Sequence, residues 1–184
     1  QNMKKELRRT LTISGEPVVE IDYATLHPAL LYAEAGLPLP ADAYDIEPWP
    51  RKLVKRGFNI MINARNEISA RRAIAELEEM AELAQPGTQE PFRLAQELIT
   101  AIRRKHQPIE HAFFSDAGAA LMNIDASLAQ RVMEICASCG IVVLPIHDSF
   151  LVRHDEADLL EEAMQKAAYE LVKIYLKTSR TEAL

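Results

Sequence analysis

Cysteine is scarce in this 184-residue chain, which holds only Cys136 and Cys139. Two thiolates cannot by themselves complete the four-ligand set of a structural zinc ion. Their spacing resembles that of a redox dithiol. We interpret both as packing residues near the end of a helix, because free cysteine behaves as a small apolar side chain.

Long apolar runs are also missing. No segment approaches the roughly 18–20 apolar residues that span a bilayer, and residues 1–10 are too polar and basic for a signal peptide. The sequence contains no internal repeat and no low-complexity tract. Its 48% apolar and 26% charged residues are ordinary for a globular protein. We therefore expect a cytoplasmic location without membrane attachment.

Positive charge is in deficit overall but is concentrated locally. The chain has 21 Lys and Arg against 27 Asp and Glu, a net charge of −6, which by itself argues against a nucleic-acid partner. The distribution of charge matters more than the sum. Basic residues cluster at 4–9, 51–72 and 103–105, whereas much of the acid lies in 76–97 and 155–170. Each cluster alone is most simply a solvated face, so neighbouring motifs must decide its role.

The order of the expected elements indicates an α+β fold. β-Branched residues predict a strand at 18–22, and two further strands, 141–146 and 149–153, flank a tight turn at His147-Asp148. Apolar residues at helical spacing predict helices at 25–35, 51–64, 68–84, 91–105, 116–138 and 156–176. We expect a small antiparallel sheet, made of a strand and a hairpin, backed by helices and interrupted by a helical insertion.

Two aspartates stand at strand ends in this arrangement. Asp22 ends the strand 18–22, and Asp148 lies at the tip of the hairpin. An isolated aspartate at such a place is most simply a turn residue. If the strand and the hairpin pair in one sheet, however, the two carboxylates meet at one edge, where their repulsion favours a divalent cation. Such oxygen ligands suit Mg²⁺, and two ions about 4 Å apart can assist phosphoryl displacement.

The helix expected at 51–64 carries a second candidate site. Arg51 and Lys55 are four residues apart and project from one face, which Arg56 extends. Two cations one turn apart suit a polyanion such as a triphosphate, because Arg binds as a fork and Lys as a point charge. A surface helix with a basic face is the alternative interpretation.

Three short motifs resemble those of known polymerases. Residues 20–28, Glu-Ile-Asp-Tyr-Ala-Thr-Leu-His-Pro, resemble polymerase motif A, and residues 51–64, R-K-L-V-K-R-G-F-N-I-M-I-N-A, resemble motif B. Residues 146–150, Ile-His-Asp-Ser-Phe, resemble motif C. The motifs are those of the family A DNA polymerases and the phage-type single-subunit RNA polymerases, in the same order. The similarity covers about residues 17–176.

The resemblance implies a role for each matching position. Asp22 and Asp148 would hold two Mg²⁺ ions, with Mn²⁺ as an alternative, and the Tyr23 carbonyl would be a further ligand. Lys55 would be catalytic and nucleotide-binding, because the resemblance places it at the α-phosphate and the leaving pyrophosphate. The remaining expected contacts are to the terminal phosphates by Arg51, to the sugar by His27, to the nucleotide by Tyr23 and Asn63, and to the template–primer by His147, Asn123, Asp125 and Arg56.

The implied organisation is a palm interrupted by short fingers. Residues 1–50 and 111–184 would form the palm and residues 51–110 the fingers, in a fragment of a longer protein whose thumb lies elsewhere. The partners would be a template–primer and nucleoside triphosphates. Ser149 and Asn63-Ala64 depart from family A, which has an acidic residue after the motif C aspartate and an aromatic residue followed by Gly at the end of motif B.

The preferred activity is DNA-directed DNA synthesis, because His27 is bulky enough to crowd a 2′-hydroxyl. His147-Asp148-Ser149-Phe150 favours an RNA polymerase as the alternative. An inactive palm-fold module that binds nucleic acid and a metal-dependent nuclease also stay open. For the isolated chain we expect weak activity or none.

Overall fold

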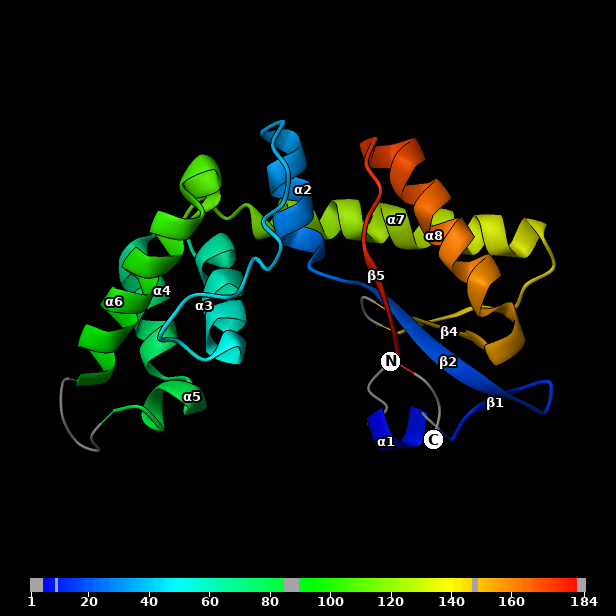
Figure 1. Ribbon diagram of the computed structural model, residues 1–184, viewed down its shortest axis with the longest axis horizontal. Helices are drawn as coiled ribbons and strands as arrows, with labels where there is room; N and C mark the ends of the chain where they lie inside the picture. The colour runs from blue at the N-terminus through cyan, green and yellow to red at the C-terminus, as the bar shows by residue number, and fades with distance from the viewer. Residues whose placement is uncertain (1–4, 9, 85–89, 147–148, 182–184) are drawn as a thin grey trace. The chain divides into compact units, whose positions relative to one another are not determined.

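The structure is a computed structural model that describes residues 5–8, 10–84, 90–146 and 149–181 (Figure 1). The chain divides into two compact units: a sheet unit, residues 1–29 and 122–184, and a helical unit, residues 30–121. The expected α+β class is confirmed, since the described residues form helices and one small antiparallel sheet of five strands. Within the described residues, no helix combines the length and apolar content that crossing a bilayer requires.

The sheet is built around one long strand. β2 (Glu16–Tyr23) pairs antiparallel with β4 (Ser149–Arg153) on one edge. On its other edge it pairs with β1 (Thr12–Ile13) and β5 (Thr178–Thr181). β3 (Leu144–Ile146) extends the sheet beyond β4. The expected pairing of the first strand with the hairpin strands is therefore confirmed for the described residues.

The two faces of the sheet differ in chemistry because side chains alternate along a strand. Val19, Ile21 and Tyr23 share the face that α8 (Ala157–Val172) covers, and the Tyr23 hydroxyl donates to the Met164 carbonyl of that helix at 2.7 Å. The opposite face carries Glu20 and Asp22. It also carries a small apolar cluster, which consists of Ile13, Val18, Ile146 and Leu151.

Three further helices complete the sheet unit or lead out of it. α7 (Gly118–Ser138) contributes a buried row to the sheet unit at Leu128, Val132 and Cys136. α1 (Lys5–Arg8) precedes the sheet, and α2 (Leu26–Glu34) follows β2 directly. The apolar row and the burial of Cys136 agree with a packing role for that cysteine, whereas Cys139 is exposed.

The helical unit is built from α3 (Arg51–Asn63), α4 (Glu67–Ala75), α5 (Glu78–Ala81) and α6 (Glu90–Lys105), which lie together at the left of Figure 1. α3, α4 and α6 contact one another in pairs. Gly57 permits the close approach of α3 and α6, because a Cβ there would lie 3.1 Å from Cδ1 of Ile102 and 3.3 Å from Cδ2 of Leu98.

The boundaries of the helical unit differ from the expected 51 and 110. Residues 30–50 belong to this unit because they fold onto α3: the Tyr44 ring meets the Phe58 ring edge-on at 5.9 Å. Residues 111–121 belong to it as well, and the Phe114 amide donates to the Met61 carbonyl at 2.8 Å. Long-range contacts of this kind leave no local pattern in the sequence.

Two expected helices are shorter in the structure. The helix expected at 68–84 breaks after Ala75, and Leu77 is extended (φ −69°, ψ 141°) before α5 begins. The helix expected at 156–176 ends at Val172, where Lys173 takes the left-handed conformation (φ 60°). The strand expected at 141–146 begins only at Leu144. Apolar spacing predicts the buried side chains in all three segments, but it does not predict where a single residue leaves the helical or extended conformation.

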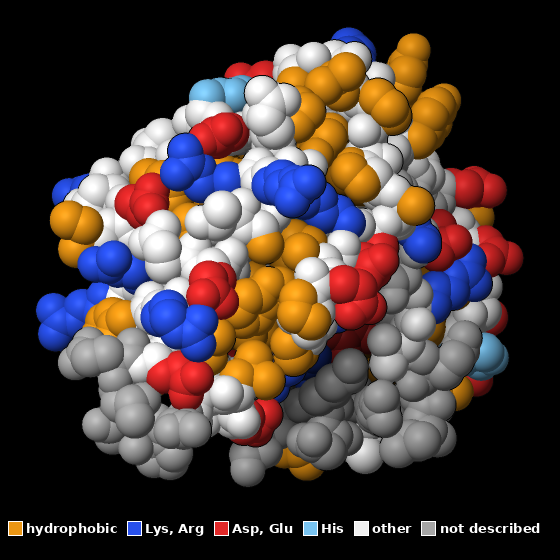
Figure 2. Space-filling model, turned by 60° about the vertical axis from the view of Figure 1, so that its left-hand side comes forward, with side chains coloured by type: hydrophobic (Ala, Val, Ile, Leu, Met, Phe, Trp, Pro, Cys, Tyr) orange, Lys and Arg blue, Asp and Glu red, His pale blue; other side chains and the backbone are white. Residues whose placement is uncertain are grey.

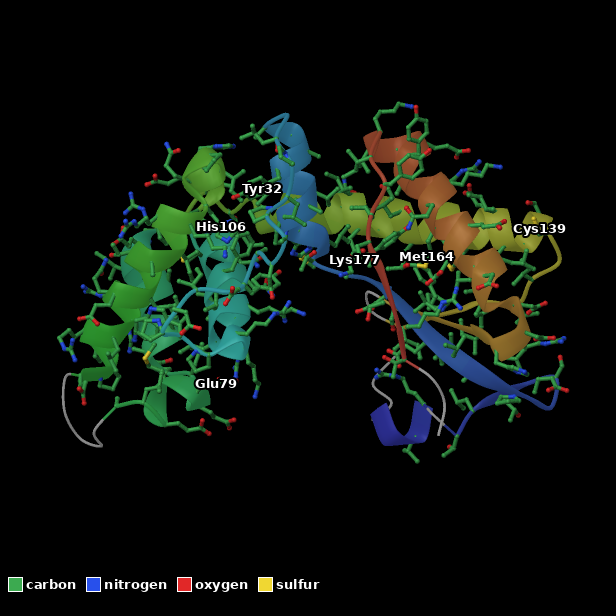
Figure 3. All side chains as sticks on the ribbon, viewed as in Figure 1. Tyr32, Glu79, His106, Cys139, Met164 and Lys177 are labelled. Atoms are coloured by element: carbon green, nitrogen blue, oxygen red, sulfur yellow. The ribbon has the colours of Figure 1, made fainter. Side chains whose placement is uncertain are left out.

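A buried histidine joins the loop, α2 and α6 of the helical unit. His106 is fully buried, and its Nε2 lies 2.8 Å from the Ala43 carbonyl oxygen, which can only accept, so Nε2 carries the proton. Its Nδ1 then accepts from the Tyr32 hydroxyl at 3.1 Å (Figure 3). Burial lowers the pKa of His106 below its ordinary value of 6.5.

This histidine should make the stability of the protein depend on pH. Because its folded-state pKa lies below 6.5, the unfolded chain binds more protons between these two values, and the free energy of unfolding falls as the pH falls through that window. One proton limits the slope to about 1.4 kcal/mol per pH unit. Urea unfolding at several pH values between 7.5 and 5 should show a smaller slope for His106→Gln. An unchanged slope would mean that other groups cause the dependence.

Candidate active site

Asp22 lies on the side of the sheet that α8 does not cover. It is the seventh residue of β2 and half-buried, and its register partners are Ser149 of β4 and Ser179 of β5. β-Branched and apolar neighbours hold this segment as a strand, so the carboxylate is fixed on a rigid element rather than on a loop. The placement at a strand end agrees with the expectation from the sequence.

His147 and Asp148 lie outside the described residues, so the approach of the Asp148 carboxylate to Asp22 stays a prediction. Its sequence neighbour is described. Ser149 directly follows Asp148 in the chain and lies opposite Asp22 in the pairing of β2 with β4. The strand that follows Asp148 therefore starts beside Asp22, as the interpretation of the two aspartates requires.

Glu20 is a second described carboxylate on this face, beside Asp22, and the motifs assign it no role. Its Oε1 accepts from the Ser149 hydroxyl at 2.7 Å and from the Arg8 guanidinium at 2.8 Å, and its Oε2 accepts from Arg8 Nε at 3.1 Å. Both side chains of the ion pair are largely buried, with 16% and 14% exposure. The period of two along β2 could have identified Glu20, since residues 20 and 22 share one face.

The donors near Asp22 fit a hard divalent cation. Carboxylates, hydroxyls and backbone carbonyls are the oxygen ligands that Mg²⁺ accepts. No group of three or more His, Cys, Asp and Glu side chains arranged for a metal occurs among the residues that the structure describes. Asp148 is not among them. Among the described residues, Asp22 is thus a carboxylate of the kind that Mg²⁺ binds, and further ligands stay a prediction.

Tyr23 can serve such an ion only through its backbone. Its side chain turns to the opposite face, where burial, and then the charge of Asp125, raise the pKa of the hydroxyl. Asp125 is half-buried on α7 and close enough to Tyr23 to act on it, whereas Asn123 is exposed and its carbonyl accepts from the Ser127 hydroxyl at 2.9 Å. Of the two α7 residues expected at the template–primer, Asn123 is the accessible one.

His27 occupies the second position of α2 and is half-buried. The chain turns sharply before it, because Thr25 adopts a positive φ of 54°. This conformation is uncommon for a β-branched residue and costs of order 1–3 kcal/mol. The strained residue lies between the strand that carries Asp22 and the helix that carries His27.

In the helical unit, α3 carries a cluster of cations at its amino-terminal end, where the helix dipole is positive. Arg51, Lys52, Lys55 and Arg56 all lie in its first six residues, no acidic residue lies in the first turn, and Pro50 provides no side-chain cap. The positive end of the helix dipole repels such charges, at a cost of about 0.3–1 kcal/mol for each exposed charge near the terminus. An anion bound at this end would be attracted by both the dipole and the side chains.

Three of these cations, Arg51, Lys52 and Arg56, form ion pairs with carboxylates. Arg51 donates to Asp42 at 2.7 Å and lies over the Tyr44 ring at 5.4 Å. Lys52 and Arg56 both bind Glu79, at 2.8 and 2.7 Å. The Lys52 and Arg56 hydrogen bonds lower the pKa of Glu79 to about 2, and the Arg51 hydrogen bond lowers that of Asp42.

Lys55 differs from its neighbours on α3. It is exposed, and the described residues offer it no ion-pair partner. On the face that Figure 2 shows, several Lys and Arg side chains lie beside Asp and Glu. An incoming phosphate could therefore bind Lys55 without displacing a carboxylate, whereas it would have to compete with Glu79 for Arg56 and with Asp42 for Arg51.

Asn63 ends α3 beside the first residue of α7. Its Nδ2 donates to the Asn59 carbonyl at 2.7 Å, and a Cβ on Gly118 would lie 2.0 Å from its Oδ1. The present side-chain position of Asn63 therefore depends on the absence of a side chain at residue 118. Nothing in the local sequence of α3 indicates this dependence.

Comparison with known proteins adds no relative: neither a protein-family profile nor a curated protein matches this chain.

Proposed function

We propose that this chain catalyses template-directed nucleotidyl transfer, with DNA synthesis as the preferred reaction. The observation that supports this most is the pairing of β2 with β4, in which Ser149, the residue after Asp148, lies opposite Asp22. Asp22 on β2, Asp148 directly before β4 in the sequence, and a helix whose amino-terminal end is strongly basic would supply the elements that this reaction needs.

In the proposed reaction, the primer 3′-oxygen attacks the α-phosphorus of a nucleoside triphosphate. The bond to the bridging oxygen breaks, pyrophosphate leaves, and the hydroxyl proton passes to solvent. Asp22 and Asp148 would hold Mg²⁺ ions, which supply charge stabilisation for the attacking and leaving oxygens. Lys55 would bind the α-phosphate and protonate the leaving pyrophosphate, and Arg51 would bind the terminal phosphates through its guanidinium.

The preference for deoxynucleotides rests on the bulk of His27. A side chain of this size near a bound sugar would crowd a 2′-hydroxyl, which is worth about ten- to a hundredfold in discrimination. Ribonucleotide use would instead favour the RNA polymerase interpretation of the same site.

A single-turnover assay tests the proposed function. With protein in excess over a labelled primed template, Mg²⁺ and one complementary deoxynucleoside triphosphate, the primer should lengthen by one residue. Excess protein compensates for weak binding to the duplex, which depends on backbone contacts and salt. Shortening of the labelled strand would support a nuclease, and binding without either change would support an inactive nucleic-acid-binding module.

Lys55 should be far more important for the reaction than Lys52, although both are exposed lysines of one helix. Lys55→Met should lower the rate of single-nucleotide addition by about a hundredfold, because it removes the phosphate ligand and the proton donor. Lys52→Met is the matched control and should change the rate less than about threefold, since Arg56 still pairs with Glu79. Equal losses in the two variants would assign the effect to general surface charge.

A further inference from the structure

We propose that Glu20 and Ser149 form a positioning pair, which fixes the first residue of β4 against Asp22 and thereby sets the affinity of the Asp22 site for a divalent ion. The inference rests on the proposed function, because it takes Asp22 as a metal ligand. It assigns roles to two described residues that the motifs leave without one.

The hydrogen-bonding geometry identifies the pair. The Ser149 side chain is buried, with 5% of the residue exposed, and its single hydroxyl proton has two acceptors in range, Glu20 Oε1 at 2.7 Å and the Ile146 carbonyl at 2.9 Å. An ionised carboxylate forms the shorter and stronger hydrogen bond of the two. A buried hydroxyl needs such a partner. Glu20 is therefore the group that holds Ser149 to β2.

Arg8 explains why a carboxylate can remain charged at this place. Its guanidinium donates to both oxygens of Glu20, at 2.8 and 3.1 Å, which leaves Oε1 shared between Arg8 and Ser149. With both oxygens already bound, Glu20 is suited to orient Ser149 rather than to ligate an ion. Loss of Glu20 would leave the largely buried charge of Arg8 without this partner.

The position of the pair links it to Asp22. Ser149 is the register partner of Asp22, and Glu20 lies two residues earlier on the same face of β2, so the hydrogen bond crosses diagonally between the strands. A slip of β4 by one residue would move all its side chains to the opposite faces. The hydrogen bond from Ser149 to Glu20 opposes such a slip at the position of Asp22, the proposed metal ligand.

The test measures Mn²⁺ affinity by electron paramagnetic resonance, with thermal unfolding as a check of folding. Ser149→Ala and Glu20→Ala should each weaken Mn²⁺ binding about tenfold, within the 10- to 100-fold range typical of groups that orient metal ligands. The double variant should lose no more than about tenfold, because the two act as one unit. Glu20→Gln keeps an oxygen that accepts from Ser149 but loses the charge that pairs with Arg8, so its loss should lie between that of Glu20→Ala and the unmodified chain.

Controls and contrary outcomes separate this inference from the function on which it rests. Ser179→Ala, on the other edge of β2 opposite Asp22, should bind Mn²⁺ normally, and so should Ser149→Thr, which keeps the hydroxyl. A hundredfold loss in the double variant, or a loss in Glu20→Gln as large as in Glu20→Ala, would overturn the positioning role. If Glu20→Ala does not fold, Ser149→Ala against Ser149→Thr decides. Unchanged Mn²⁺ binding in Asp22→Asn would instead overturn the proposed metal site.

Discussion

Replacing Asp22 with Asn should lower single-turnover nucleotide addition by about a thousandfold, which corresponds to about 4 kcal/mol of transition-state stabilisation. Asn has the same shape as Asp but no charge, so it holds a divalent ion far less well, and metal ions contribute several kcal/mol to such displacements. The half-buried position of Asp22 on β2 limits the ability of water to replace the lost ligand. Primer extension by one nucleotide, measured with protein in excess, gives the rate.

The matched control for this experiment is Asp155→Asn in the same unit. Asp155 follows β4 and pairs with Arg153 on the surface. Surface pairs contribute at most about 1 kcal/mol to stability, and this one involves neither of the register partners of Asp22. Its rate should stay within about twofold of the unmodified chain. A folded Asp22→Asn protein with full activity would rule out the proposed reaction at this site.

Phe58→Ala should destabilise the helical unit by about 3–5 kcal/mol, the cost of truncating a fully buried aromatic side chain. The ring of Phe58 is completely buried in α3 and meets three other rings edge-on, those of Tyr44, His106 and Phe113, at 5.9, 5.1 and 5.4 Å. Truncation leaves a cavity beside His106, whose hydrogen bonds tie the loop to α6.

The single tryptophan of the chain allows the unfolding of the helical unit to be measured by itself. Trp49 lies in the helical unit and is half-buried, so its fluorescence reports the unfolding of that unit in urea. Phe92→Ala is the matched control, because Phe92 lies on α6 with 39% exposure and should cost less than about 1 kcal/mol. Similar midpoints for the two variants would show that the aromatic cluster contributes little.

Local sequence patterns were sufficient to predict the elements that carry the candidate site. β-Branched residues marked the strand that ends near Asp22, and apolar spacing marked α3 with its basic face. β5 escaped prediction because Thr178–Thr181 is polar and becomes a strand only by pairing with the edge of β2. The end of α8 escaped because Lys173, not Gly, takes the left-handed conformation there.

The partners of the site residues could not be predicted for a different reason. Glu79 binds Lys52 and Arg56 from more than 20 positions away, and Glu20 meets Ser149 across 129 positions. Contacts of this kind arise from packing and strand register rather than from local propensity. Sequence periodicity thus indicated which side chains share a face, but not which charges on that face are already paired.

The pairing of β2 with β4 also constrains how the chain can fold. Asp22 and Ser149 are 127 positions apart, and the helical unit lies between them as one continuous segment. At roughly 5–20 residues per second, synthesis of that interval takes about 6–25 s. Local helical contacts form in microseconds to milliseconds, so the helical unit can fold while β2 still lacks β4.

During this interval the part of β2 beyond its pairing with β1, which carries Val18, Val19 and Ile21, still lacks its partners β4 and β5. Such an edge is a template for association between nascent chains. Glu20 and Asp22 interrupt the apolar run with two negative charges on one face, which opposes the stacking of one copy of β2 on another. The carboxylates proposed to serve the folded protein thus also protect its central strand from aggregation before the protein has folded.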